Sequence, residues 1–334
     1  MSSYRGDIAA GAGAGFIPWE KLVGKTLLVT GASGLIGGAV VDIVSAGCPG
    51  CRIIAGGRNV ARMQKRFPNV EIWQQDLSNV QPEDFPTFDY AVHAAGAANP
   101  ALYSKHPVEV ITTAFHSLEA MLRRNSAGGR ILFVSSDEVY GQCDKMLISE
   151  SDSGYVDCTS ARSCYPSAKR LCESLCASYV SEYGADIVTV RPSHVYGPYF
   201  TDQDNRVYAQ FIRNAINGED IVMKSRGEQM RSWCYSADCA SAILTVLLKG
   251  ETGEAYNIAD NNSEFTIRDL AGMISGICGT SIRMECPPEE ESRGYNPVKR
   301  SVLSTRKLES LGWRPLETSA REKLASTIFT QKQL

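Results

Sequence analysis

The chain has 334 residues, 43% of them hydrophobic, and a formal net charge of -3. This length permits two domains, or one large domain with a smaller lobe, around a sizeable core. Interspersed acids and bases at nearly neutral balance exclude the basic surface that nucleic-acid binding requires. Because no apolar run approaches about 18 residues and no apolar leader follows the N-terminal charges, we expect a cytoplasmic protein without membrane spans.

The eleven cysteines do not suggest a disulfide framework, since their number is odd and their spacing irregular in a long chain. Cys48-Pro-Gly-Cys51 would need a second pair or histidines to form a metal or redox site, and nothing completes it. We therefore predict a surface loop there and no metal site. Cys172 and Cys176 have helical spacing and are expected to face the core.

The pattern of apolar runs predicts an α/β fold. Residues 1–24 form a Gly/Ala-rich extension that we do not expect to hold structure alone. From Lys25 onward, short apolar strands alternate with helical segments, which implies right-handed βαβ units and a doubly wound parallel sheet. The expected strands are TLLVT, RIIAG, VEIW, DYAVHAAG, RILFVSS and DIVTVRP, and helices are expected from about Leu35, near Val60, over 104–124 and over 165–183.

After about Pro198 the pattern changes to short strands and helices with turn-rich connections. We therefore expect a main domain over 25–198 and a smaller mixed lobe over 199–330. Residues near 234–258, which include SADCASAILTVLL, are expected to return to the main sheet.

A glycine-rich turn follows the first expected strand. Gly31, Gly34 and Gly37 have the spacing that permits a tight turn, close approach to a pyrophosphate, and packing of a helix on a strand. The helix N-terminus would face the anionic phosphates. The strand before and the helix after this turn favour a Rossmann-type dinucleotide site, for which we take Gly31, Ser33, Gly34, Leu35, Ile36 and Gly37 as cofactor-binding residues.

The end of the second strand bears on the choice between NAD and NADP. Gly57 stands about where an acid would bind both ribose hydroxyls of NAD, and Arg58 beside it suits a 2′-phosphate. The residues Gly57-Arg58 therefore favour NADP, with Asn59 adjacent to the same site. Asp76 and Leu77 follow the third strand and are candidates for contact with the adenine, although an acid at a strand end is also an ordinary cap.

Tyr165 and Lys169 stand four residues apart on one face of an expected helix, about 30 residues after Ser136. A phenol with its ordinary pKa of roughly 10 needs about 4 kcal/mol of preferential phenolate stabilisation to act as a base near pH 7. Lys169 and an oxidised nicotinamide are the groups expected to supply it. Ser136 would orient the substrate hydroxyl.

With these motifs in order, the chain resembles the extended short-chain dehydrogenase/reductases, the NAD-dependent epimerase/dehydratase family. TGASGLIG, HAAG, SSDEVYG, YPSAK, RPSHVYGP, RSWCYSAD and KLESLGWRP carry the resemblance from about Lys25 to Pro315. It implies a recycled cofactor, NAD by family habit, contacted also by Ala94, Ala95 and Gly96. It further implies a nucleotide-diphosphate sugar substrate bound by the smaller lobe, and a homodimer joined by the helices near 104–124 and 165–183.

The acids Asp137 and Glu138 sharpen this resemblance. Simple 4-epimerases of the family carry small residues there, whereas sugar-nucleotide 4,6-dehydratases carry Thr-Asp-Glu, which Ser136-Asp137-Glu138 nearly matches. A 4,6-dehydratase is therefore the first expectation. Glu138 would remove the C5 proton and a neutral Asp137 would protonate the departing C6 hydroxyl, after Tyr165 and the cofactor have made a 4-ketone. If the strand simply continued, Asp137 would point away from Ser136 and Glu138.

UDP-glucuronate decarboxylases are the alternative, because they keep the Glu, place Ser before it, and use an arginine near the C-terminus for the substrate carboxylate. Arg300 falls near that position. A 4-epimerase follows, and a non-catalytic dinucleotide-binding protein is the alternative from another class, disfavoured because both Tyr165 and Lys169 are present.

Three further residues are expected at the sugar nucleotide. Arg231 matches the family arginine that grips the diphosphate, a bidentate task suited to guanidinium. His194 stands where the family usually has Asn beside the substrate phosphates, and a structural hydrogen bond is the alternative role for this histidine. Arg206 is a candidate for the nucleotide.

Overall fold

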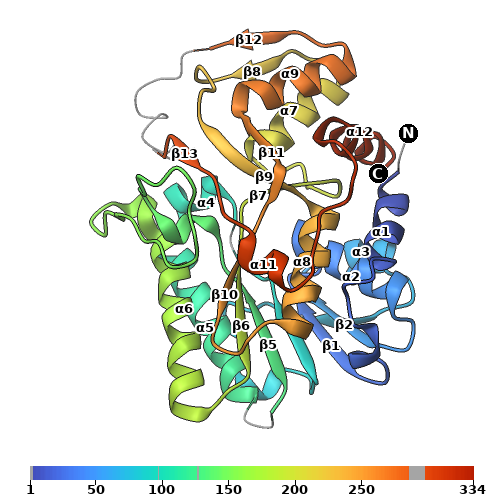
Figure 1. Cartoon of the computed structure of the whole chain (residues 1–334), viewed down its shortest axis with the longest axis vertical. Helices are drawn as coiled ribbons and strands as arrows, with labels where there is room; N and C mark the ends of the chain where they lie inside the picture. Colours follow the sequence, from blue (N-terminus) through green and yellow to red (C-terminus); the bar gives the residue numbers. More distant parts are fainter. Residues whose placement is uncertain (1–2, 97, 126–127, 286–297) are drawn as a thin grey trace.

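The larger lobe is built on a parallel sheet (Figure 1). The computed structural model describes residues 3–96, 98–125, 128–285 and 298–334, and within these residues the sheet has seven strands in the order β10-β6-β5-β4-β1-β2-β3. All its neighbouring strands are parallel. They are β1 (Thr26–Thr30), β2 (Arg52–Gly57), β3 (Glu71–Gln74), β4 (Tyr90–His93), β5 (Arg130–Val134), β6 (Ile187–Pro192) and β10 (Ala255–Ile258). The reversal between β1 and β4 confirms the predicted Rossmann-type α/β fold.

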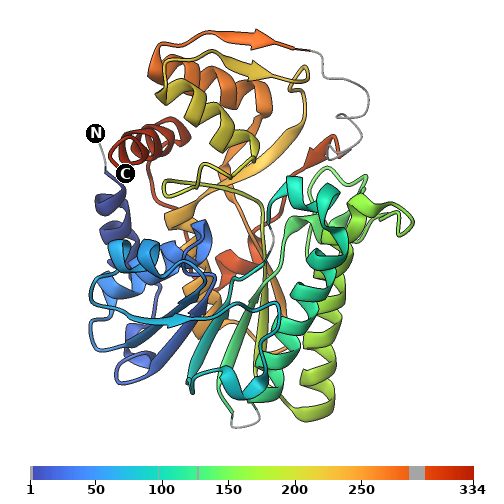
Figure 2. The ribbon, with the colours of Figure 1, turned by 180° about the vertical axis from the view of Figure 1, so that it is seen from behind.

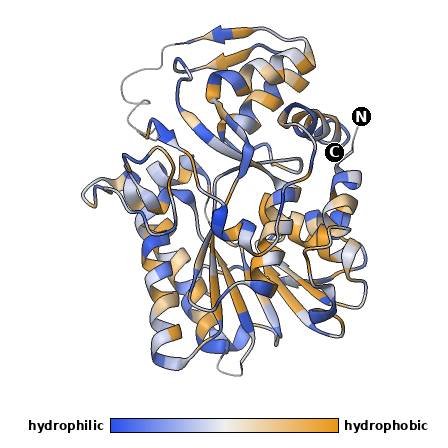
Figure 3. Ribbon diagram, in the orientation of Figure 1, coloured by the Kyte–Doolittle hydropathy of each residue, from blue (hydrophilic) through white to orange (hydrophobic). Residues whose placement is uncertain are grey.

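Both faces of this sheet are buried, as parallel sheets require. Along β1, Leu27 and Val29 contribute to one apolar cluster, and Leu28 contributes to the other. The first face is covered by α2 (Leu35–Gly47) and α8 (Ser236–Lys249), the second by α5 (Pro107–Arg124) and α6 (Cys164–Tyr183). Figure 2 shows the second pair from behind, and in Figure 3 hydrophobic residues follow the central strands and the helices packed on them.

The expected helix over 104–124 is interrupted. The structure has α4 (Pro100–Lys105) and then α5, which begins at Pro107. His106 between them is not helical, because a residue before proline is disfavoured in the α conformation. The helix expected over 165–183 is α6, which starts one residue earlier.

A smaller lobe lies above the carboxyl ends of the main strands (Figure 1). In its described part, β9 pairs with β11, β13 and β7, and β8 pairs with β12. Between β9 and β11 the chain returns to the main sheet through α8 and β10. The strands are β7 (His194–Tyr196), β8 (Ile221–Met223), β9 (Met230–Tyr235), β11 (Asp260–Thr266), β12 (Ile282–Met284) and β13 (Arg300–Ser301). The helices are α7 (Val207–Ile216), α9 (Ile267–Cys278) and α12 (Ala320–Gln331), whereas α11 (Arg306–Ser310) lies against β10 of the main sheet.

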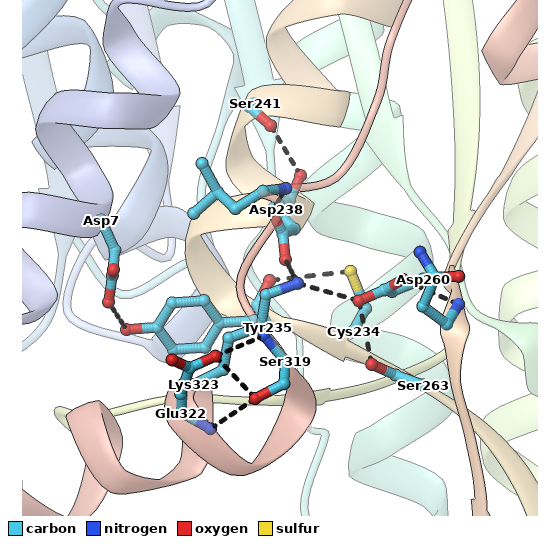
Figure 4. A network of polar contacts seen from close by, with 12 residues as sticks. Asp7, Cys234, Tyr235, Asp238, Ser241, Asp260, Ser263, Ser319, Glu322 and Lys323 are labelled. Carbon is cyan, nitrogen blue, oxygen red and sulfur yellow. Dashed lines mark hydrogen bonds and ion pairs between the residues drawn. The ribbon is translucent and has the colours of Figure 1, made fainter. Parts of the chain in front are cut away.

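The N-terminal extension acquires structure by packing. Its helix α1 (Tyr4–Ala12) is capped by Ser3 and lies against α2, α8 and α12. Asp7 is buried and accepts hydrogen bonds from the hydroxyls of Tyr235, at 2.9 Å, and Ser326, at 2.7 Å. Figure 4 shows the first of these contacts. The first and last helices of the chain are thus joined through one carboxylate.

A buried ion cluster joins α12 to the rest of the molecule (Figure 4). The Lys323 ammonium lies 2.8 Å from the carboxylate of Asp238 and 2.9 Å from that of Asp260, and all three side chains are at most 2% exposed. Burial raises the pKa of Asp238 to about 6 although Lys323 acts in the opposite direction. The cluster connects α8, β11 and α12.

The cysteine predictions have a divided outcome. Cys172 and Cys176 lie in the core, as expected. Cys48 and Cys51 flank a turn between α2 and β2, but both are buried, so the prediction of a surface loop was wrong about their side chains. Among the described residues, no helix is both long and apolar enough to cross a membrane, and no cluster of three or more potential metal ligands occurs.

Candidate active site

The glycine-rich turn after β1 has the geometry that the motif predicts. Gly31 has φ +70°, and a Cβ there would lie 2.7 Å from the Ala94 carbonyl oxygen. A Cβ on Gly37 would lie 2.5 Å from the Gly31 carbonyl oxygen. Gly34 precedes α2 without a side-chain cap, which leaves the first N–H groups of Leu35, Ile36 and Gly37 open to an anion. These residues fit the pyrophosphate of a dinucleotide.

The residues expected around the adenosine ribose lie together at the ends of β2 and β3. A Cβ on Gly57 would stand 3.3 Å from Ser33 Oγ, and Arg58 is exposed beside it. Asn59 caps α3 (Val60–Arg66) by accepting from the Arg62 N–H. Asp76 accepts the Ser78 N–H, which lowers its pKa, and Arg58 contributes a smaller effect. Asp76 is therefore at least a turn cap, the alternative role that the sequence left open, and Leu77 packs against the core.

Sequence reasoning missed Arg62. Its Nε donates to the Ser33 carbonyl oxygen at 3.1 Å, and its Nη2 donates to the Tyr199 carbonyl oxygen. Arg62 therefore fastens the glycine-rich turn to the loop after β7. Arg62 stands four residues after Arg58, about one helical turn, and this spacing was the signal in the sequence that could have identified it.

Tyr165 and Lys169 project from the first turns of α6 toward the end of β5. Lys169 Nζ donates to the Val134 carbonyl oxygen at 2.7 Å and lies 5.8 Å from the centre of the Tyr165 ring. A Cβ on Gly96 would stand 3.8 Å from the same ammonium, and the Ala95 N–H donates to Thr30 Oγ1. Ala94, Ala95 and Gly96 therefore lie between the glycine-rich turn and Lys169, where they could contact a dinucleotide.

Burial dominates the ionisation of both groups. It lowers the pKa of Lys169 to about 8. Burial and the nearby carboxylates of Glu138 and Asp137 raise the pKa of Tyr165 above its ordinary value. The side chains around Tyr165 do not by themselves lower its pKa toward that of a base.

The acidic pair after β5 does not continue the strand. Ser136 ends the extended backbone, and its Oγ accepts the Glu138 N–H at 3.2 Å, which starts a short 3-10 helix, η4 (Asp137–Tyr140). Because the chain turns there, Asp137 and Glu138 do not alternate as they would on a strand. The turn that follows Ser136 therefore positions both carboxylates, that of Asp137 buried and that of Glu138 partly exposed.

Asp137 is buried and surrounded by donors. Ser301 Oγ donates to its Oδ2 at 2.9 Å, Ser136 Oγ donates to its Oδ1 at 3.3 Å, and His194 Nδ1 lies 3.5 Å from Oδ2. Burial alone would raise the pKa of Asp137, but His194, Ser301 and Arg231 outweigh it and lower the pKa. The expectation of a neutral Asp137 was therefore wrong in this structure, because its neighbours stabilise the carboxylate.

Glu138 is held by an arginine that the sequence reasoning did not single out. Arg162 donates to both carboxylate oxygens of Glu138, at 3.1 Å each. The Arg162 guanidinium also lies over the ring of Tyr103, at 5.0 Å, and that ring stacks on Tyr165 at 4.7 Å. Arg162 thus contacts Glu138 and the Tyr103 ring, and Tyr103 in turn stacks on Tyr165. The location of Arg162 three residues before Tyr165 was a signal in the sequence.

The arginines expected at the substrate divide into two groups. Arg231 is buried, donates to the carbonyl oxygens of Met230 and Val298, and is close enough to influence the ionisation of Asp137. Arg206 forms an ion pair with Asp204 at 2.5 Å, and its charge acts on Tyr165. Both lie near the carboxylates and Tyr165.

Arg300 does not join them. Its Nε donates to the Met146 carbonyl oxygen at 2.9 Å, and Nη2 lies 3.9 Å from Glu264. Since neighbouring residues on a strand point to opposite sides, Ser301 faces Asp137 while Arg300 faces away. Ser301 is thus a site residue that sequence reasoning missed by one position.

Comparisons with known proteins identify the family. The sequence model of the NAD dependent epimerase/dehydratase family matches residues 27–259. UDP-glucuronic acid decarboxylase 6 of Arabidopsis thaliana is 30% identical over 297 residues, covering 86% of this chain and 84% of the plant protein.

Solved structures of this type are also similar. The structure of a dTDP-glucose 4,6-dehydratase from Streptomyces venezuelae with NAD bound is 25% identical, with a TM-score of 0.81, and the match covers 92% of this chain and 97% of that one. A UDP-glucose 4-epimerase from Thermotoga maritima has the same TM-score at 24% identity, over 92% of this chain and 99% of the epimerase.

Proposed function

Because the chain belongs to the NAD dependent epimerase/dehydratase family of nucleotide-sugar enzymes, we propose that it decarboxylates a nucleotide-diphosphate glucuronic acid through a transient 4-keto intermediate. The decarboxylase relatives, similar over most of their length, support this reaction above the 4,6-dehydratase that the acidic pair first suggests. The observation in the site that carries the proposal is the environment of Asp137. Dehydration requires an acid for the departing hydroxyl, and Asp137 is stabilised as a carboxylate by Ser301 and His194.

The residues of the dinucleotide site would hold the cofactor in a defined way. The N–H groups at the start of α2 would bind the pyrophosphate, and Ser33, Gly57 and Arg58 would surround the adenosine ribose. When bound, the oxidised nicotinamide would accept hydride from C4 of the sugar and return it, and its positive charge would favour the phenolate of Tyr165. The family and its solved relatives support NAD, while Arg58 favours NADP.

The chain's own residues would then divide the chemistry. Tyr165 would take the proton of the C4 hydroxyl while Ser136 orients that hydroxyl, and Tyr165 would return the proton at the end of the cycle. Lys169, fixed on Val134, would keep positive charge beside the phenol. Arg231 and Arg206 are the proposed diphosphate and nucleotide contacts. Once C4 is a ketone, the bond from C5 to the carboxylate breaks, because its electron pair is delocalised onto the C4 oxygen.

The placement of Arg300 argues for a different carboxylate contact than the one first expected. Arg300 lies away from Asp137, with its Nε on the Met146 carbonyl oxygen. Arg162 is also hydrogen-bonded, to both carboxylate oxygens of Glu138, but it lies within the site. We therefore propose that Arg162 and Ser301, rather than Arg300, flank the sugar's acidic end.

A 4,6-dehydratase is the second candidate, favoured by the triplet Ser136-Asp137-Glu138 and by the similar dTDP-glucose 4,6-dehydratase structure. The deciding experiment offers the purified protein a panel of UDP-, dTDP-, GDP- and CDP-sugars that includes UDP-glucuronic acid and records product masses. Loss of carbon dioxide from the uronate supports the proposal. Loss of water from a neutral hexose supports the second candidate, and a changed configuration at unchanged mass indicates an epimerase and contradicts both.

We further propose a domain division and an assembly. The dinucleotide-binding domain would comprise residues 25–198 with the return segment near 234–258, and the remainder of 199–330 would bind the sugar nucleotide. Two chains would associate through α5 and α6, which expose the large apolar side chains of Val108, Ile111, Leu171 and Tyr183.

A further inference from the structure

His194 stands where the resemblance to the family predicts Asn, and its side chain lies beside the buried carboxylate of Asp137. Its Nδ1 is buried and lies 3.5 Å from Asp137 Oδ2, with no hydrogen-bond partner elsewhere among the described residues. The imidazole packs edge-on against Trp233, at 5.5 Å between ring centres, which limits its rotation. The side chain is nevertheless 29% exposed. One ring nitrogen is therefore directed at a carboxylate, and the remainder of the ring reaches solvent.

The proposed reaction requires a group that delivers a proton to C5 of the sugar and can be reprotonated by solvent. Loss of carbon dioxide from a uronate leaves an electron pair at C5. This carbon must be protonated, so each turnover consumes one proton. The proton that Tyr165 handles is taken from and returned to the C4 hydroxyl, and it cannot also serve C5. A second group must supply a proton and recover one from solvent in every cycle.

The other polar groups near Tyr165 do not suit this task. Lys169 is buried and donates to Val134, and Glu138 is held by two hydrogen bonds from Arg162. Asp137 is buried, and Ser301 and His194 stabilise its charged form. An imidazole, in contrast, is a group that can give up and regain a proton near neutral pH.

We infer that His194, oriented by Asp137, donates the proton that replaces the departing carboxylate on the sugar carbon. This inference rests on the proposed decarboxylation. The bond between C5 and the carboxylate breaks, carbon dioxide leaves, and the electron pair resides in the enolate of C4 and C5. A new C–H bond forms at C5 with the proton from His194 Nε2, the C4 ketone is restored, and the neutral imidazole recovers a proton from solvent. Asp137 acts as a positioning residue, and Ser301 and Arg231 keep it charged.

The test follows one turnover of His194→Asn. The Asn side chain is polar and can form a hydrogen bond, but it cannot transfer a proton. With UDP-glucuronic acid, the variant is expected to form reduced nicotinamide, seen at 340 nm, and to release carbon dioxide at close to the wild-type rate. Return to oxidised cofactor and product release are expected to slow by about 10²-fold, the typical contribution of a general acid. The reduced cofactor would therefore accumulate only in the variant.

Three controls make the outcome decisive. His106→Asn changes an exposed histidine between α4 and α5 and is expected to behave as wild type. Asp137→Asn should show the same accumulation as His194→Asn, which guards against misfolding of one variant. Free imidazole should restore turnover to His194→Ala, because a structural defect would not respond to it.

The possible failures can be told apart. If the wild type releases carbon dioxide and His194→Asn shows no accumulation, or if formation and reoxidation of reduced cofactor slow equally without imidazole rescue, the role of His194 is refuted. If the wild type releases no carbon dioxide from any uronate, the proposed function is refuted and the role of His194 with it.

Discussion

Tyr165 is the residue on which the proposed chemistry depends most directly. Its pKa is raised by burial and by the carboxylates of Glu138 and Asp137, so we expect the phenol to be protonated before a cofactor binds. Removal of its hydroxyl leaves the ring stacked on Tyr103. Replacement of Tyr165 by Phe therefore removes the hydroxyl without removing the ring packing.

Tyr165→Phe is expected to reduce turnover by about 10²-fold to 10⁴-fold, because general-base catalysis is lost. Bound nicotinamide, measured by absorbance and fluorescence of the purified protein, should be unchanged. Tyr155→Phe, at a position 63% exposed, is the matched control. Wild-type turnover in Tyr165→Phe would remove this tyrosine from the mechanism.

Arg58 is the residue that we propose influences the choice between NAD and NADP. Arg58→Ala is expected to raise the dissociation constant of NADP by about 10-fold to 100-fold, the value of one hydrogen-bonded charge contact, and to affect NAD much less. Fluorescence titration with both dinucleotides provides the measurement, and Arg52→Ala, an exposed arginine paired with Glu71, is the control. An equal effect on both cofactors would contradict a phosphate contact.

At the scale of elements, β4 is joined to β1 and α5 through one buried histidine. His93 Nδ1 lies 3.0 Å from Thr30 Oγ1, and its Nε2 lies 3.3 Å from Ser117 Oγ. Burial and the charge of Lys169 lower the pKa of His93 to about 3. This strand end therefore carries a neutral imidazole at ordinary pH.

The stability of the protein should consequently fall in mild acid. Between about pH 6.5 and pH 3 the unfolded chain binds a proton at His93 that the folded chain does not, so the free energy of unfolding decreases as the pH falls. His93 alone is expected to contribute a loss of about 2 kcal/mol between pH 7 and pH 5. Urea unfolding at both pH values should show this loss in wild type and in His116→Gln, but not in His93→Gln. An unchanged pH dependence in His93→Gln would be inconsistent with a neutral buried histidine.

The elements also indicate what sequence could and could not predict. Alternating strands and helices, the glycine spacing and the Tyr165-Lys169 pair were sufficient for the sheet and the cofactor turn, because these features depend on local periodicity. The contacts of Asp137 depend on Ser301, which is 164 residues away and reaches it only because β13 pairs with β9. The pairing of β13 with β9 cannot be recognised from a local sequence pattern. The sequence therefore suggested Arg300, the neighbour of Ser301, as the site residue. The bidentate contact between Arg162 and Glu138 likewise depends on η4 turning the chain after Ser136.

At the scale of the whole molecule, the lobes are held together by buried charges as well as by apolar packing. Lys323 balances Asp238 and Asp260, and each belongs to a different element. Lys323→Met would leave two carboxylates buried without their cation. The expected decrease in the free energy of unfolding is about 3–5 kcal/mol, measured by urea denaturation. Lys145→Met, at an exposed position, should change it by less than about 0.5 kcal/mol, and a similarly small effect at Lys323 would mean that the cluster is unimportant.

The proposed assembly makes a separate prediction. Sedimentation of the wild type is expected to give twice the mass of one chain. Ile111→Arg, which places a charge on the exposed apolar face of α5, should shift the protein to a single chain. Phe329→Arg alters an equally apolar but different surface, on α12, and should leave the dimer intact. A wild-type protein that sediments as one chain would exclude this interface.

The contact between Asp7 and Ser326 has a consequence for biosynthesis. Domains generally begin to fold from the N-terminal side while the ribosome is still adding residues. The carboxylate of Asp7, however, lacks one of its two hydroxyl donors until residue 326 has been translated and has left the exit tunnel. We therefore expect the first helix, which also packs on α2 and α8, to complete its buried polar contacts only after α12 has been synthesised.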